Sequence, residues 1–153
     1  MRHAETVANV HGRRQGWHDS PLSEAGKLQS IKAGKLMHGL FDRVLCSPLG
    51  RATETVKLMS LGVPVTMLDE LRERDWLNES DCDVMQRLKP LLCRDDLDRS
   101  LIVTHGRTAR LLESIITSRK LSNIKAFANT EVRSFTPYLD VFFTTLWRPQ
   151  GDF

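Results

Sequence analysis

The sequence predicts an α/β fold of three layers, in which helices cover both faces of a mainly parallel sheet. Short apolar segments that suit strands alternate along the chain with segments whose apolar residues recur at helical spacing, an order typical of this architecture. Residues 101–104 form an unbroken run of the kind that is buried in parallel sheets. The chain has 153 residues, 41% of them hydrophobic and 27% charged, with no repeat or linker. We therefore treat residues 1–153 as a single domain.

The first part of the chain is predicted to be a loop followed by a helix and a strand. Residues 2–22 are polar and contain two glycines and a proline, a composition typical of a long loop, and long loops in compact domains are usually functional. Ser23 is a suitable N-cap, and a rough helical stripe continues from it to about Leu40. Residues 43–46 form a short apolar strand.

The second helix is predicted to start at Ser47. Serine at the N-cap followed by Pro48 at the first helical position is a strong helix start, and the apolar face of this helix continues to Met59. Pro90 is expected to kink a later helix over residues 84–92. The other predicted elements are strands over 63–68 and 101–104, a helix over 111–116, and two strands within 132–147 that are broken at Pro137.

Composition and charge exclude several classes of protein. The net charge is +3, with 22 basic and 19 acidic residues spread along the chain, so we expect no nucleic-acid partner. The apolar runs are too short for a transmembrane helix, and no secretory signal is visible at Met1. Cys46, Cys82 and Cys93 lack metal-ligand spacing. We expect free thiols in a reducing compartment, a cytoplasmic location and no bound metal.

Basic and titratable side chains follow two of the predicted strands. Arg51 follows the first strand and His105 follows the run at 101–104, and the carboxyl ends of parallel strands are where such sheets bind ligands. Together with Arg2 and His3 they suit a phosphate dianion, because arginine grips phosphate oxygens with fixed donors. Histidine can act as a nucleophile or a proton-transfer group. The acidic stretch 69–73 can bring a general acid to the same edge.

The chain resembles the histidine phosphatase superfamily, in its phosphoglycerate mutase-like branch. Six segments match the family's motifs in family order, and together they cover most of the chain. In this sequence the matching segments are RHAETVAN at 2–9, QGWHDSPLSEAG at 15–26, SPLGRATET at 47–55, LRERDW at 71–76, ESDCDVMQR at 79–87 and VTHG at 103–106.

The resemblance implies a role for each of these residues. His3 attacks phosphorus and becomes a phosphohistidine, while Arg2, Asn9, Arg51 and His105 bind the phosphoryl oxygens and steady the transition state. Glu73 is the general acid and base; Glu70 has similar spacing and is the less favoured alternative. No cofactor is needed. Candidate rim residues of the pocket are Gln15, Gly16, Glu79 and Ser80.

Two departures from the family pattern bear on activity. Family members carry an apolar central strand before the Arg-His pair, but only Met1 precedes Arg2 here. We expect that the coding sequence starts upstream, that this region is rebuilt in a trimmed variant, or that a partner chain supplies the strand. Between Glu73 and Glu79 the lid-like insertion of the family is missing, so we expect an open pocket with weak substrate discrimination and no mutase activity.

The preferred hypothesis is a phosphatase that hydrolyses small phosphomonoesters through a phosphohistidine on His3. The alternative is a catalytically impaired phosphate-binding or interaction module derived from such an enzyme, which the missing strand and lid favour. Protein phosphohistidine signalling is a third, weaker alternative. We expect a monomer or a homodimer with a small phosphorylated substrate, and no membrane partner.

Overall fold

A three-stranded parallel sheet forms the centre of the protein. The computed structural model describes residues 1–135 and 145–147. The strand order is β2 (Val65–Met67), β1 (Arg43–Cys46) and β3 (Ser100–Val103), and both pairings of β1 are parallel. All three strands therefore end at the same edge of the sheet, which brings the segments that follow them close together.

Alternation along β1 divides the interior into two cores. Val44 and Cys46 belong to one cluster of buried side chains, whereas Leu45 between them belongs to the other. Successive side chains of a strand point to opposite faces of the sheet, so both faces are apolar and both need a cover. In the sheet, Leu45 lies opposite Thr66 of β2 and Ile102 of β3.

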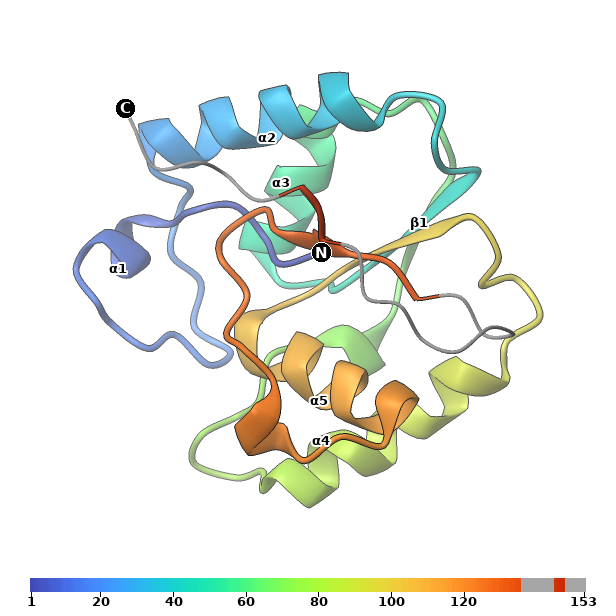
Figure 1. The fold of residues 1–153 in the computed structure, drawn as a ribbon. Coiled ribbons are helices and arrows are strands. Elements are labelled where there is room, and N and C mark those ends of the chain that lie inside the picture. The colour runs from blue at the N-terminus through green and yellow to red at the C-terminus, as the bar shows by residue number, and fades with distance from the viewer. Residues whose placement is uncertain (136–144, 148–153) are drawn as a thin grey trace.

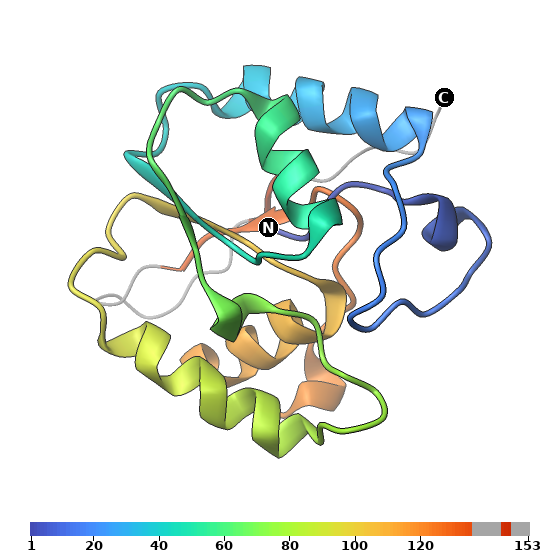
Figure 2. The same ribbon diagram turned by 180° about the vertical axis from the view of Figure 1, so that it is seen from behind.

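Two pairs of helices supply these covers and make the three layers. On one face lie α2 (Glu24–Met37) and α3 (Gly50–Met59), and on the other lie α4 (Asp81–Leu88) and α5 (Gly106–Thr117). Figure 1 shows the two pairs above and below the strands, and Figure 2 shows the same arrangement from behind. The predicted three-layer α/β fold is confirmed.

The helices α2 and α3 touch at a glycine. A Cβ atom built on Gly34 would lie 1.9 Å from the main-chain oxygen of Met59, far inside van der Waals contact. The absence of a side chain at Gly34 therefore lets the two backbones approach closely, and Ala33 and Met37 beside it are buried in the core.

The start of the chain lies beside β3. The main-chain nitrogen of Met1 donates to the carbonyl of Ile102 (2.7 Å), and Met1 accepts from the N–H of Thr104 (2.9 Å). On its other side Arg2 bonds the backbone of residues 130–131. This segment continues into β4 (Val132–Arg133), which pairs antiparallel with β5 (Thr145–Trp147). His3, directly after Arg2, is thereby fixed at the carboxyl edge of the sheet.

Several predicted element boundaries differ from the structure. The helix predicted from Ser47 begins at Gly50, and its N-cap, Leu49, makes no side-chain capping bond. Pro90 does not kink a continuous helix: α4 ends at Leu88 and a 3-10 turn follows. Ser23 caps α2 as predicted, accepting from the N–H of Gly26 (3.0 Å).

The remaining elements are short. A one-turn helix, α1 (Val7–Val10), lies inside the predicted loop. Two strands were predicted within 132–147, and β4 and β5 lie there, while the predicted break at Pro137 is outside the described residues. None of the helices in the described part of the chain has the length and apolar character needed to cross a membrane. The 3-10 turns are η1 (Asp69–Leu71), η2 (Lys89–Cys93) and η3 (Leu121–Asn123).

Candidate active site

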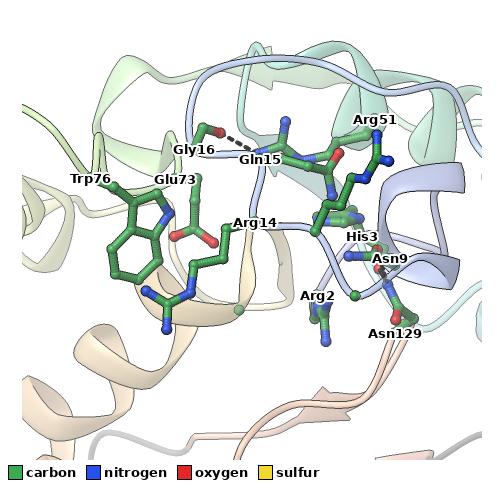
Figure 3. A pocket seen from close by; sticks show the side chains of 13 residues that line it. Arg2, His3, Asn9, Arg14, Gln15, Gly16, Arg51, Glu73, Trp76 and Asn129 are labelled. Atoms are coloured by element: carbon green, nitrogen blue, oxygen red, sulfur yellow. Dashed lines mark hydrogen bonds between the residues drawn. The ribbon is translucent and has the colours of Figure 1, made fainter.

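A cavity of about 410 Å³ opens at the carboxyl edge of the sheet (Figure 3). Seven of the residues that the sequence singled out line it, and Asn129 and Trp76 line it as well. His105 is not in the lining but its ring contacts His3. Glu79 and Ser80 lie elsewhere: Glu79 pairs with Arg87 (2.9 Å) and Ser80 caps α4. The seven predicted residues in the lining are Arg2, His3, Asn9, Gln15, Gly16, Arg51 and Glu73.

His3 is held as a neutral imidazole with one nitrogen available. It is 3% exposed, and burial, followed by the charges of Arg2 and Arg51, lowers its pKa to about 3. Its Nδ1 lies 2.7 Å from the carbonyl oxygen of Ala4, an acceptor, so Nδ1 carries the proton and donates it. The other nitrogen, Nε2, keeps its lone pair, which is what a nucleophile needs.

His105 lies beside His3 in a fully buried position. The two ring centroids are 5.2 Å apart and the rings are tilted by 58°. Burial lowers the pKa of His105 well below its ordinary value, and the nearby His3 ring and the charge of Arg51 lower it further. Its Nε2 shares a hydrogen bond of 2.7 Å with the hydroxyl of Ser47. The same hydroxyl accepts from the N–H of Leu49 (3.3 Å), so Ser47 bonds the backbone just before α3 as well as His105.

Arg51 is almost completely buried, at 2% exposure, and is held by the loop before α2. Its terminal nitrogens donate to the carbonyls of Gly16 (2.7 Å) and His18 (3.1 Å) and to the carboxylate of Asp19 (2.9 Å). Asp19 also accepts from the N–H of Gly50 (2.6 Å) at the start of α3. These bonds fix the guanidinium in the cavity wall but leave its Nε buried without a partner among the described residues.

Arg2 approaches the cavity from the other side, and like Arg51 it has a buried guanidinium N–H group without a partner among the described residues. Its Nη1 donates to the carbonyl of Phe127 (2.8 Å), while its Nε is buried and has no partner in the described part of the chain. Burial lowers the pKa of both Arg2 and Arg51, although arginine stays charged in proteins. Buried donors are normally satisfied. An unpartnered Nε also occurs, within the described structure, in Arg43, Arg72 and Arg110. Arg2 and Arg51 are the two that line the cavity, where their N–H groups suit a bound oxyanion.

Glu73 lies at the start of α5. Its carboxylate accepts from the N–H groups of Arg107 (3.3 Å) and Thr108 (3.2 Å), in the first turn of that helix, where negative charge is favoured. Of the two acidic candidates only Glu73 lines the cavity, whereas Glu70 lines a separate hollow with Trp17 and Arg87.

Asn129 is a site residue that the sequence reasoning missed. Its Nδ2 donates to the carbonyl of His3 (3.1 Å) and to Oδ1 of Asn9 (3.2 Å), and Oδ1 of Asn9 also accepts from the N–H of Thr6 (3.2 Å). With its oxygen occupied by two donors, Asn9 has its own Nδ2 left to donate to a ligand. No periodic pattern or motif around Asn129 marks it in the sequence, because its partners lie more than a hundred residues away.

No cluster of three or more candidate metal ligands occurs among residues 1–135 and 145–147. Free thiols at Cys46, Cys82 and Cys93 agree with the expectation from their spacing. Burial raises the pKa of the Cys46 thiol to about 12, so this sulfur stays protonated in the core. Around His3, the guanidiniums of Arg2 and Arg51, the imidazole of His105, the carboxylate of Glu73 and the amide of Asn9 can together hold an oxyanion beside a nucleophile.

Comparison with known proteins agrees with this chemistry. The family model described as histidine phosphatase superfamily (branch 1) matches residues 1–82. The adenosylcobalamin/alpha-ribazole phosphatase of Escherichia coli (strain K12) is 39% identical over 92 residues, which are 56% of this chain and 45% of that protein. The probable phosphoglycerate mutase GpmB of Salmonella arizonae is 35% identical over 78 residues, 49% of this chain and 36% of that protein. The matches thus span less than half of each curated relative.

Solved structures share the fold over most of the chain. Bacillus stearothermophilus YhfR superposes with a TM-score of 0.76 at 25% sequence identity, over 95% of this chain and 92% of that one. The similarity extends beyond residues 1–82 to the second half of the chain. This half contains His105, Asn129 and the helix α5, whose first N–H groups donate to Glu73.

Proposed function

The chain belongs to the histidine phosphatase superfamily (branch 1), and from this premise we propose that it hydrolyses phosphate monoesters of small molecules through a phosphohistidine on His3. The observation that carries the proposal is the pair of unsatisfied Nε–H groups of Arg2 and Arg51 in the cavity lined by a neutral His3. A phosphoryl group between them satisfies both donors and lies next to the nucleophile.

In the first step, Nε2 of His3 attacks phosphorus and the ester oxygen leaves. The lone pair of Nε2 forms the N–P bond while the P–O bond to the leaving group breaks. The Nε–H groups of Arg2 and Arg51 and the Nδ2–H of Asn9 donate to the three equatorial oxygens, where charge accumulates in the transition state. The Nδ1–H bond to the Ala4 carbonyl (2.7 Å) stabilises the positive charge that the attacking imidazole acquires.

Glu73 transfers the proton in both steps. As the acid it protonates the departing oxygen, which turns an alkoxide into an alcohol. As the resulting carboxylate it takes a proton from a water molecule that attacks the phosphohistidine. The N–P bond then breaks, inorganic phosphate leaves, and both His3 and the protonated Glu73 are restored for the next cycle.

His105 acts on the same phosphoryl group from its position beside His3. Its Nδ1 is buried without a partner in the described structure, and its Nε2 is fixed by Ser47. When the hydroxyl of Ser47 donates to Nε2, the neutral ring carries its proton on Nδ1, and this Nδ1–H is the donor for an anionic phosphoryl oxygen. We expect hydrolysis rather than mutase transfer, because the segment between Glu73 and Glu79 is short.

Hydrolysis of p-nitrophenyl phosphate tests the proposal. We expect turnover by the protein, loss of turnover to background in His3→Ala, and retention in His38→Ala, which removes an exposed histidine at the end of α2. Equal rates in the protein and in His3→Ala contradict the proposal. Binding of vanadate without any turnover supports the alternative of a phosphate-binding module.

A further inference from the structure

Two arginines at the cavity lie outside the set that the mechanism uses. Arg13 and Arg14 both line the cavity and both are exposed. Within the described residues neither side chain forms an ion pair or a hydrogen bond, in contrast to Arg74 close by, which pairs with Asp81 (2.9 Å) and donates to the carbonyl of Glu79 (2.7 Å). The positive charges of Arg13 and Arg14 are thus uncompensated.

The loop that carries them has a fixed backbone. The N–H of Arg13 donates to the carbonyl of Ala8 (2.8 Å), and the side chain of Gln15 donates to the hydroxyl of Thr6 (2.9 Å). Gly16 has a positive φ of 53° and packs under Trp76: a Cβ atom at Gly16 would lie 3.2 Å from Cδ1 of that ring. The arginines are therefore presented by an ordered loop.

Trp76 in turn holds the guanidinium of Arg14. The Cζ atom of Arg14 lies 4.9 Å from the ring centroid, and the anchored Arg74 also contacts this ring, at 4.8 Å. Stacking on an aromatic ring orients a guanidinium without using its N–H groups. Figure 3 shows Arg14 and Trp76 on the side of the cavity opposite Asn9 and Asn129, away from the phosphoryl end.

Negative partners are distributed unevenly among the arginines that line the cavity. Four arginines and one carboxylate line it, and both histidines of the site are neutral. Asp19 pairs with Arg51 (2.9 Å), and a phosphoryl dianion bound by Arg2 and Arg51 adds further negative charge at the inner end. Arg13 and Arg14 line the same cavity without such a carboxylate partner among the described residues, so their charges are available to a second anion at the mouth.

We propose that Arg14, assisted by Arg13, forms a second anion subsite at the mouth of the cavity. The substrate class is then a small phosphomonoester whose leaving group carries a second acidic group, a carboxylate or a further phosphate. The inference rests on the proposed function in one respect: the phosphoryl end of the substrate lies at His3. The N–H groups of Arg14 that stacking leaves unused donate to the second anion.

Binding of phosphonates tests the subsite without any turnover, because their C–P bond is not hydrolysed. The probes are alkylphosphonates and the matching phosphonates that end in a carboxylate, in a series of chain lengths, with affinities measured by calorimetry. We expect one chain length at which the carboxylate improves affinity about fivefold, as for a partly solvated ion pair. A third series, in which a second phosphonate replaces the carboxylate at the far end of the chain, distinguishes a carboxylate subsite from a phosphate subsite.

Two variants assign the effect to Arg14. Arg14→Gln abolishes the preference for the second anion, whereas Lys57→Gln, which removes one exposed positive charge on α3, keeps it. Equal affinities for both series at every length, absence of binding by either series, or the same loss in both variants overturns the subsite. If the preference is present but p-nitrophenyl phosphate is not hydrolysed, the proposed function fails and the subsite remains.

Discussion

The imidazole rings of His3 and His105 lie with their centroids 5.2 Å apart, and burial lowers the pKa of both rings. Arg2 and Arg51 add to this effect, because their positive charges disfavour a further cation in the same site. The site thus concentrates N–H donors and fixed positive charge around two neutral rings. A neutral His3 is ready to attack, and a phosphoryl dianion is the ligand whose charge this environment favours.

The two neutral rings make stability depend on pH. In the unfolded chain histidine binds a proton with a pKa near 6.5, but native His3 does so only near 3. Between these values the unfolded state holds more protons, so the free energy of unfolding falls as the pH is lowered below about 6.5. His3 contributes about 1.4 kcal/mol per pH unit to the slope of this free energy against pH. Above neutrality His3 no longer makes the free energy of unfolding depend on pH.

Urea unfolding across the range from about pH 7 to about pH 4.5 measures this slope. We expect His3→Asn to reduce the slope by about 1.4 kcal/mol per pH unit. The same substitution at exposed His38 controls for the loss of an imidazole elsewhere. Identical slopes in the protein and in His3→Asn contradict a depressed pKa at His3.

Replacement of Glu73 by glutamine should affect poor leaving groups most. Alkyl phosphates release an alkoxide that needs a proton, and we expect Glu73→Gln to lower kcat for them by about 10²- to 10³-fold. The loss for p-nitrophenyl phosphate is smaller, because nitrophenolate leaves without protonation. Glu70→Gln serves as the control outside the cavity. Steady-state kinetics in which the two variants behave alike would reject Glu73 as the acid.

Asn129 is predicted to act through Asn9. Its removal in Asn129→Ala frees the amide of Asn9 to rotate, and we expect kcat/KM to fall by about tenfold, equivalent to about 1.4 kcal/mol of transition-state stabilisation. Asn129→Asp falls further, because a carboxylate oxygen then faces the oxygens of Asn9 and His3. Thermal unfolding of both variants separates this effect from loss of folding. Unchanged kcat/KM in Asn129→Asp speaks against the positioning role.

The contact between α2 and α3 makes Gly34 sensitive to the smallest side chain. A methyl group there overlaps the Met59 carbonyl, so Gly34→Ala forces the helices apart and lowers the free energy of unfolding by about 1–3 kcal/mol. Lys35→Ala, one residue along the same helix and exposed, changes it by only a few tenths of a kcal/mol, as expected from helix propensity. Urea unfolding that gives equal losses in both variants refutes the close contact.

The layers were predictable from sequence because their cause is local. Val44, Leu45 and Cys46 are apolar in succession, and a strand that is buried on both faces needs this pattern. Ser47 shows where such reasoning fails. The hydroxyl of Ser47 makes the local bond expected of a serine before proline, accepting from the N–H of Leu49 (3.3 Å). It also bonds His105, 58 residues away, and a long-range partner is invisible to a local rule.

The same distinction holds for the site. Residues inside motifs, such as His3, Arg51 and Glu73, line the cavity, because the motifs follow strands that end at one edge. Asn129 has no motif, yet it lines the cavity and its side chain bonds His3 and Asn9 at the start of the chain. Glu79, which the motif suggested as a rim residue, instead pairs with Arg87 in the last turn of α4.

The central claim is that His3 carries the phosphoryl group, and trapping the intermediate tests it most directly. Protein mixed with an excess of p-nitrophenyl phosphate is quenched in alkali, in which phosphohistidine survives, and is analysed by peptide mass spectrometry. We predict one phosphoryl group on the peptide that contains His3, more of it in Glu73→Gln, in which hydrolysis of the intermediate is slowed, and none in His3→Ala. A phosphoryl group on any other residue, or turnover with no phosphorylated His3 in Glu73→Gln, would contradict the account.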